Sequence, residues 1–387
     1  MAEPQTGSLG PLRIVDFSRV LAGPLATMVL ADLGAVVTKV ERPDGGDDSR
    51  QWGPPFDEAG MATYFLSVNR NKDSVALDLR VPEGVQAAHD LIDGADVVVE
   101  NFRPGVMRRL GLGYDQLRTR CPGLVYCSIS AFGTGPGAAL PGYDTLVQAV
   151  GGLMSITGEP DRPPQRVGVA LIDVVAGLYA AVGILAALRH RDRSGEGQLV
   201  EVDLMSALLA SLVNQSTAYT AAGVVPQRLG NAHPSVVSSD LFETADGAVM
   251  IAAGNDRQFA DLCRVLGLES LSDDEQFRTN SGRIQHRDLL RRLLREKCAD
   301  RTTDSLVADF ANAGVPAGRV NDIAQAFELA ESLGLEPIVT IPRGPDDVAP
   351  VRLPRSPIRM SATPPTYRSA PPRLGESDHV AAAVGSP

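Results

Sequence analysis

Asp173 is the residue most suited to chemistry, because it is the one charged side chain in the apolar stretch from 167 to 188. An ionised carboxylate among apolar residues is unfavourable unless it is paired or hydrogen-bonded. If Asp173 lies in the first turn of a helix, backbone N–H groups and the helix dipole can stabilise it, and its role is structural. Alternatively, it is retained to react, since carboxylates act as nucleophiles that divide one difficult step into two easier ones. The spacing leaves both interpretations open.

Basic residues gather near the ends of three predicted strands, where an α/β sheet places its ligand contacts. For a single arginine a solvated position is the simpler interpretation, but the recurrence at three strand ends favours an anion pocket. Gly23, at a predicted helix start, can also offer N–H groups to a phosphate or carbonyl. The chain has no GxGxxG and no P-loop lysine motif, which argues against a dinucleotide or NTP site. The clusters are Arg42; Arg70 and Lys72; and Arg103, Arg108 and Arg109.

Two further motifs are weaker candidates. Tyr143 and Asp144 precede a predicted helix, where an acidic first turn is a sufficient structural explanation. His233 lies in a polar loop, in which a lone histidine is usually only exposed. The five histidines are scattered without metal-ligand spacing, so no metal site is expected. No GxSxG or Cys–His signal is present.

Alternating strands and helices in the first third of the chain predict a doubly wound α/β sheet that binds ligands beyond the carboxyl ends of its strands. The first two strands and the helix between them form a βαβ unit with a right-handed crossover. That helix begins near Gly23-Pro24 and ends before Gly34. The predicted strands span residues 12–17, 35–41, 74–79, 96–100 and 124–130, with a further helix over 82–92.

The second half of the chain has a different pattern of predicted secondary structure, with more helices and fewer strands. A helical stretch follows from about 203 to 222, and Asp246-Gly247 between apolar runs indicates a hairpin over 241–252. Helical periodicity then covers 256–266, 287–299 and 303–313. We therefore expect an α/β large domain over 1–225, a smaller α+β domain over 226–325, and a linker with a C-terminal segment over 326–387.

Composition and charge limit the partners and the compartment that are expected for this protein. The 387 residues carry a net charge of −11, which argues against nucleic acid as a partner. The four cysteines form no metal-type or CxxC spacing, which favours a reducing compartment. The first residues lack a basic-then-apolar leader, so a cytoplasmic protein is expected. The stretch 167–188 is long enough to span a bilayer, but a buried core helix is the favoured interpretation.

Many short motifs, in order along nearly the whole chain, resemble the family III CoA-transferases, a group that includes formyl-CoA transferase, carnitine CoA-transferase and succinate–hydroxymethylglutarate CoA-transferase, together with the related α-methylacyl-CoA racemases. Each motif alone is weak, and their number and order carry the resemblance. The motifs are Val15-Asp16-Phe17, Ala22-Gly23-Pro24, the segment 30–35, the segment 39–43, Asn69 to Lys72, the segment 100–105, Gly142-Tyr143-Asp144, Gly151 to Met154, Asp173 with Gly177 to Ala180, Gly230 to Pro234, Gly254 to Asp256, and Gly314 to Gly318.

The resemblance implies roles for particular residues. Asp173 matches the catalytic aspartate, which attacks an acyl-CoA thioester and then carries CoA as an aspartyl thioester. The family fold implies an interlocked homodimer of ring-shaped chains, in which the C-terminal segment returns to the large, CoA-binding domain. CoA and acyl-CoA are implied as substrates, with no tightly bound cofactor. The positions implied to contact CoA are Leu21, Ala22, Arg42, Asn71, Lys72, Asn101, Phe102 and Arg109; those lining the acyl site are Tyr143, Asp144 and His233.

Two departures from the wider family refine this expectation. Tyr143 stands where the racemases carry a histidine base, and His233-Pro234 stand where formyl-CoA transferase has a glycine-rich loop. We therefore expect a donor such as succinyl-CoA or another dicarboxyl-CoA, and a carboxylic acid acceptor. The alternatives are a 2-methylacyl-CoA racemase or epimerase on the same fold, a non-catalytic partner subunit of a heteromeric CoA-transferase, and a membrane protein.

Overall fold

The computed structural model describes residues 7–344 and 349–379, and it divides into two compact units. Unit 1 comprises Met1–Leu153, Arg166–Val224 and Glu336–Pro387, and unit 2 comprises Met154–Gln165 and Val225–Leu335. Residues 1–6, which belong to the segment where the sequence predicts no leader, lie outside the described range. Unit 2 therefore includes a short segment near 160 and residues 326–335, which the sequence had assigned to the large domain and to the linker.

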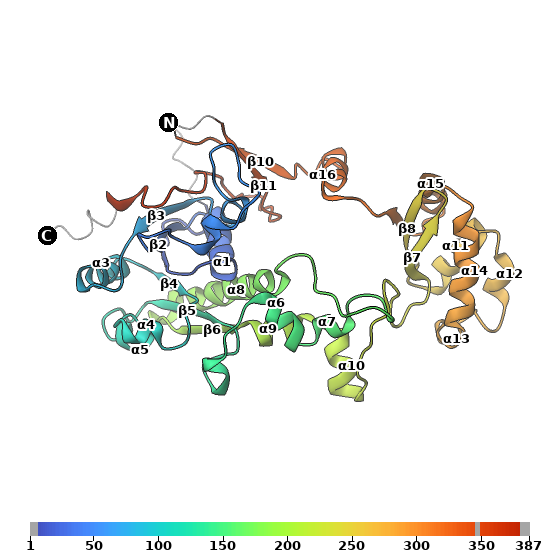
Figure 1. The fold of residues 1–387 in the computed structure, drawn as a ribbon, viewed down its shortest axis with the longest axis horizontal. Coiled ribbons are helices and arrows are strands. Elements are labelled where there is room, and N and C mark those ends of the chain that lie inside the picture. The colour runs from blue at the N-terminus through green and yellow to red at the C-terminus, as the bar shows by residue number, and fades with distance from the viewer. Residues whose placement is uncertain (1–6, 345–348, 380–387) are drawn as a thin grey trace. The chain divides into compact units, whose positions relative to one another are not determined.

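Unit 1 is built on a six-stranded parallel sheet in the order β3-β2-β1-β4-β5-β6 (Figure 1). The predicted doubly wound α/β sheet is confirmed. β6 was not predicted, because its run of Leu, Val, Glu, Val and Asp is short and half polar. The strands are β1 (Arg13–Asp16), β2 (Val36–Glu41), β3 (Lys72–Ala76), β4 (Val97–Glu100), β5 (Val125–Ser130) and β6 (Leu199–Asp203).

Helices cover both faces of this sheet. Consecutive strand residues point to opposite faces, so neighbouring valines of one strand pack against different helices. Val97, Val99 and Val125 pack with α1 (Ala22–Asp32) and α8 (Leu171–Ser194). Val98 packs on the other side with α3 (Pro82–Asp93), α4 (Val106–Arg109) and α5 (Tyr114–Leu117) (Figure 1). The sheet therefore lies between two layers of helices, as in other doubly wound α/β folds.

The long apolar helix α8 packs closely on α1. A Cβ atom added at Gly177 would lie 2.5 Å from the carbonyl oxygen of Ala22, so glycine permits this approach. Ile172, Ala176, Ala180 and Ile184 are fully buried along the same face. Of the helices described, α8 is long and apolar enough to cross a membrane by length and composition. Along its buried face it is a core helix of unit 1.

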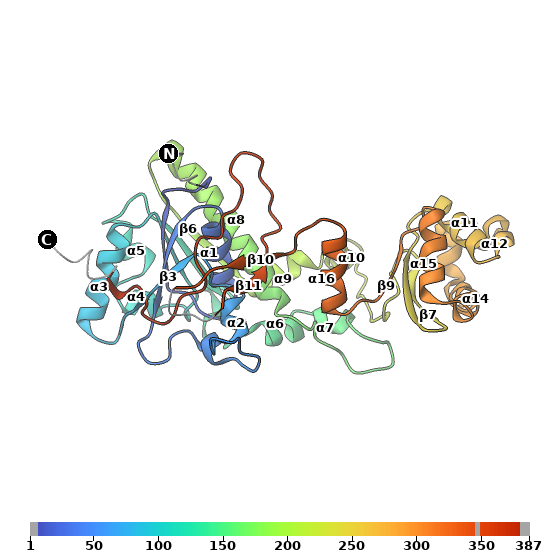
Figure 2. The ribbon, with the colours of Figure 1, turned by 90° about the horizontal axis from the view of Figure 1, so that it is seen from above.

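Shorter elements complete unit 1. The predicted helical stretch after residue 203 is two helices, which meet at Val213 with its positive φ of 45°. The C-terminal segment runs beside β3, where the Ser377 amide donates to the Ser74 carbonyl (Figure 2). The elements are η1 (Asp48–Gln51), α2 (Thr63–Leu66), η2 (Pro136–Ala139), α6 (Asp144–Val150), α7 (Leu153–Ile156, which crosses the unit boundary), α9 (Leu204–Ser211), α10 (Asn214–Ala222), β10 (Ile338–Ile341) and β11 (Val351–Pro354).

Unit 2 has its own core and a three-stranded antiparallel sheet in the order β7-β8-β9. The predicted hairpin is present, with Thr244 paired to Gly247 beside the turn. Phe242, Val249, Phe259 and Phe310 are buried between the sheet and the helices. The elements are β7 (Ser239–Thr244), β8 (Gly247–Ala252), β9 (Ala317–Arg319), α11 (Asp256–Val265), α12 (Glu269–Asp273), α13 (Asn280–Gln285), α14 (Arg287–Ala299), α15 (Thr303–Asn312) and α16 (Ile323–Ser332).

Candidate active site

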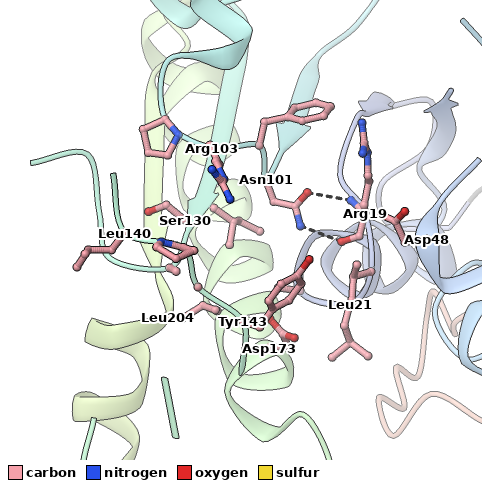
Figure 3. Close-up of a pocket in the computed structure, with 18 residues that line it drawn as sticks. Arg19, Leu21, Asp48, Asn101, Arg103, Ser130, Leu140, Tyr143, Asp173 and Leu204 are labelled. Carbon is pink, nitrogen blue, oxygen red and sulfur yellow. Dashed lines mark hydrogen bonds between the residues drawn. The ribbon is translucent and has the colours of Figure 1, made fainter. Parts of the chain in front are cut away.

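A cavity of about 300 Å³ in unit 1 opens where the carboxyl ends of β4 and β5 meet the N-terminal ends of α1 and α8. Such a crevice is the usual ligand site of an open α/β sheet. Figure 3 shows Asp173 and Tyr143 beside each other in it, with Arg19 and Arg103 on the opposite wall. The predicted residues that line it are Leu21, Ala22, Asn101, Phe102, Tyr143 and Asp173.

Asp173 lies in the first turn of α8 and lines the cavity. Its own amide and that of Ile172 donate to a different carboxylate, Asp144. No residue in the described ranges donates a hydrogen bond to the Asp173 carboxylate. Burial, and then the nearby Asp144, raise the pKa of Asp173 to about 7. A carboxylate this basic is a stronger nucleophile than an exposed one.

Asn101 fixes the opposite wall by holding the backbone of Arg19. Its side-chain oxygen accepts from the Arg19 amide at 2.9 Å, and its nitrogen donates to the Arg19 carbonyl at 2.8 Å (Figure 3). The Arg19 guanidinium then lies 4.8 Å from the centre of the Phe102 ring. Asn101 and Phe102 therefore orient a cation beside the cavity as well as lining it.

A second cavity, of about 420 Å³, shares Arg19 and Phe102 with the first. Its walls are largely apolar, and Arg42 lies on its rim, paired with Asp48 at 2.6 Å. The two cavities together offer room for an elongated ligand with a reactive end near Asp173.

A family model described as CoA-transferase family III matches residues 9–378 of the chain. The chain belongs to this family. It is a CoA-transferase, as the sequence motifs predicted.

Its relatives match over nearly the full length. The succinate–glutarate CoA-transferase of Agrobacterium fabrum is 42% identical over 376 residues, covering 95% of this chain and 93% of the relative. The succinyl-CoA:glutarate CoA-transferase of Homo sapiens is 39% identical over 366 residues, covering 94% and 83%. A solved structure of a CaiB/BaiF family protein from Brucella suis has 42% identity and a TM-score of 0.86, covering 98% of this chain and 99% of that one.

Three of the predicted contact residues of this CoA-transferase are buried in unit 1. Lys72 is fully buried, with its ammonium on Asp16 at 3.1 Å, so its side chain faces the interior, and its assignment to CoA stays a prediction. Asn71 is buried as well, and its side chain donates to Asp32 at 2.8 Å and to Thr366 of the C-terminal segment at 2.7 Å. Asp144 lies behind Asp173 as a helix cap, instead of facing the acyl group. Sequence motifs alone do not distinguish a buried polar residue from a ligand contact.

Two other predicted contacts lie apart from the cavity. Arg109 is exposed on α4 and does not line either cavity of the CoA-transferase. His233 is exposed in unit 2, where its Nδ1 accepts from the Ser235 amide at 3.1 Å. Their assignments to CoA and to the acyl site stay predictions.

The structure adds cavity residues that the sequence analysis did not single out. Arg19 and Ser130 line the first cavity, and Arg103, named only as part of a basic cluster, lies beside them. Tyr64 of α2 is also close to Asp173: after burial, Asp173 and Asp144 raise the pKa of its phenol. A signal for Arg19 was available, because it lies three residues after the end of the first strand, as Arg42 directly follows the second.

Asp173→Asn should stabilise the CoA-transferase in a pH-dependent way. The folded pKa of Asp173, about 7, lies above its ordinary value of 3.8, so folding favours the protonated form. The ionised carboxylate therefore destabilises the fold increasingly between about pH 4 and pH 7, and fully above pH 7. We expect the melting temperature of Asp173→Asn to exceed that of the wild type by a few degrees above pH 7, with the gain shrinking toward pH 4.

Thermal unfolding between about pH 4 and pH 9 measures this difference. Asp192→Asn is the matched control, since Asp192 is an exposed aspartate on the same helix. A difference between Asp173→Asn and wild type that stays constant with pH would contradict the prediction.

Proposed function

We propose that this enzyme transfers CoA from a dicarboxyl-CoA donor to a carboxylic acid through an aspartyl-CoA thioester at Asp173. The observation that carries the proposal is the half-buried Asp173 carboxylate, which lines the cavity and receives no hydrogen bond from the described residues. Such a carboxylate is basic and accessible to a thioester at the same time.

The chemistry follows from that placement. An oxygen of the Asp173 carboxylate attacks the thioester carbonyl, the C–S bond breaks, and a mixed anhydride and the CoA thiolate form. The thiolate attacks the aspartyl carbonyl, and the donor acid leaves as its carboxylate. The acceptor carboxylate then attacks the aspartyl-CoA thioester to give a new anhydride and thiolate. Attack of the thiolate on the acyl carbonyl releases the new acyl-CoA and restores Asp173.

The cavity walls support binding of CoA along the path from Arg42 to Asp173. Leu21 is the N-cap of α1 and makes no side-chain cap hydrogen bond, and both Leu21 and Ala22 line the first cavity, so the start of α1 lies at the cavity. Amides at a helix N-terminus favour anionic groups and developing oxyanions. The apolar second cavity with Arg42 at its rim suits a nucleotide base and its phosphates.

Two arginines support a dicarboxylate as the transferred acid. Arg103 lines the first cavity, and no ion pair or hydrogen bond joins its side chain to another described residue. Arg19 lines the same cavity and contacts the Phe102 face. A guanidinium without a carboxylate partner suits the second carboxylate of a succinyl or glutaryl group. The relatives named for succinate and glutarate support the same substrate class.

Mixing the protein with succinyl-CoA in the absence of an acceptor should trap the intermediate. Because the aspartyl-CoA thioester is covalent, the intact mass is expected to rise by that of CoA less one water in the wild type. Hydroxylamine should remove the adduct, and peptide mapping should place the product on Asp173. Asp173→Ala should form no adduct, whereas the exposed Asp192→Asn control should form it normally.

An adduct that persists in Asp173→Ala would contradict the proposed nucleophile. No adduct in the wild type with any of a panel of donors, accompanied by exchange of the 2-hydrogen of a branched acyl-CoA, would instead support a racemase.

Arg103→Met should reduce selectivity for a dicarboxylic acceptor. Loss of a charge-assisted hydrogen bond is worth about 1.5–3 kcal/mol, so we expect kcat/KM for glutarate to fall about ten- to hundredfold, with little change for valerate of equal length. Arg118→Met, an exposed arginine on the end of α5, is the control. An equal fall for glutarate and valerate would assign Arg103 to CoA instead.

We also propose that the enzyme is a homodimer. Large apolar side chains are exposed on α8 and α10 of unit 1, including Val182 at 63% and Tyr219 at 61%, and on α16 of unit 2, where Ile323 is 80% exposed. Apolar surface of this extent is typical of a protein interface. Light scattering should give twice the mass of the chain, and the mass of a single chain would contradict the proposal.

A further inference from the structure

The amides of the first turn of α8 are all occupied. Those of Ile172 and Asp173 donate to the same oxygen of Asp144, at 2.7 and 3.2 Å. The Leu171 amide donates to the Val169 carbonyl, and the Val174 amide donates to the Ala170 carbonyl. The side chain of the N-cap residue normally accepts hydrogen bonds from such amides, but the N-cap of α8 is Ala170, which has no group to accept them. At this helix, a residue from α6 takes them and the reactive residue does not.

Asp144 is held in place by Gln148, one turn further along α6. The Gln148 amide nitrogen donates to the second oxygen of Asp144 at 2.6 Å, and its oxygen accepts from the Val167 amide at 2.9 Å. Asp144 is 5% exposed and Gln148 is fully buried. The pair therefore fixes both the first turn of α8 and the segment that leads into it.

We propose that Asp144 is a positioning residue that occupies the α8 amides, so that the Asp173 carboxylate has no donors and stays a strong nucleophile. This inference rests on the proposed role of Asp173. Hydrogen bonds to an ionised carboxylate stabilise it and make it less basic. By taking those hydrogen bonds, Asp144 keeps Asp173 basic, and its own negative charge acts in the same direction.

Electrostatics around Asp173 agree with this geometry. After burial, Asp144 is the group that raises the pKa of Asp173. Arg19 and Arg103 line the same cavity. The ionisable groups that face Asp173 or share its cavity are Asp144 from α6, Tyr143 beside it, Tyr64 from α2, Asp48 from η1, Arg19 after β1, and Arg103 after β4.

Asp144→Asn removes the negative charge of Asp144 and keeps a side chain of nearly the same shape. The asparagine oxygen can still accept from both α8 amides, so the helix start should be retained while the charge and the hydrogen bond from Gln148 are lost. Because the repulsion is removed, Asp173 should ionise at lower pH. We expect the acid limb of the kcat/KM profile to move down by about one pH unit, and adduct formation at pH 9 to slow about three- to tenfold as basicity falls.

Gln148→Met provides a second test, because it removes the hydrogen bond to the second oxygen of Asp144 and so weakens the hold of Asp144 on the α8 amides. The acid limb should again move to lower pH, by less than in Asp144→Asn. Asp322→Asn is the matched control: Asp322 caps α16 of unit 2 in the same manner, through the Gln325 amide at 2.8 Å. Its pH profile should equal that of the wild type.

Titration of ¹³C-labelled aspartate carboxylates by NMR tests the inference without relying on turnover. The resonance absent from Asp173→Asn belongs to Asp173, and its midpoint should be near pH 7 in the wild type and lower in Asp144→Asn and Gln148→Met. A wild-type midpoint in both variants, with only reduced stability, would show that Asp144 is a structural cap and overturn the proposal. Shifted midpoints without any covalent adduct in the wild type would overturn the proposed function and leave the effect of Asp144 established.

Discussion

The arrangement of the site depends on a buried pair of charges, Lys39 and Asp47. The two groups are 2.9 Å apart and their side chains are fully buried. Lys39 also donates to the Ser18 carbonyl at 2.8 Å, and Asp47 accepts from the Val20 amide at 3.1 Å. Val20 has a φ of 69°, which is unfavourable for a β-branched residue and persists only where its surroundings enforce it. Because removing one partner of a buried pair costs about 3–5 kcal/mol, the loop that leads to Leu21 and Ala22 is held firmly.

The same charges connect the cavity to the C-terminal segment. Beside Lys39, Glu41 accepts from Arg50, which in turn donates to the Pro372 carbonyl at 3.0 Å. Asn71 bonds to the same segment through Thr366. The polar residues at the edge of the sheet thus satisfy one another and the returning chain, which is how so many buried charges are tolerated. The wall of the cavity is stable because residues 295 and 322 positions apart complete one network.

Much of this was predictable from the sequence, and the failures have a common cause. The period of apolar residues predicted the parallel sheet, and a position of Asp173 in the first turn of a helix was one of the two interpretations that the sequence left open. Short motifs identified the residues around the cavity, including Asn101 and Tyr143. The sequence did not show that Lys72 is paired with Asp16 inside the unit, or that Asp144 caps a helix 27 residues further on. Both depend on which elements meet in space, and a motif records neighbours in the chain only.

The two carboxylates at the start of α8 explain why a destabilised acid suits this chemistry. In the free enzyme the Asp173 charge is opposed by burial and by Asp144, whose own charge is satisfied by the helix amides and Gln148. In the proposed mechanism Asp173 becomes an anhydride and then a thioester, so its charge disappears and the repulsion disappears with it. The unfavourable energy of the free enzyme would then be released as the covalent intermediate forms, which would lower the intermediate relative to the resting state. If the α8 amides donated to Asp173 instead, they would stabilise its charge and raise the energy needed to form the intermediate. The proposed chemistry is therefore favoured when these amides bond to Asp144, which does not react.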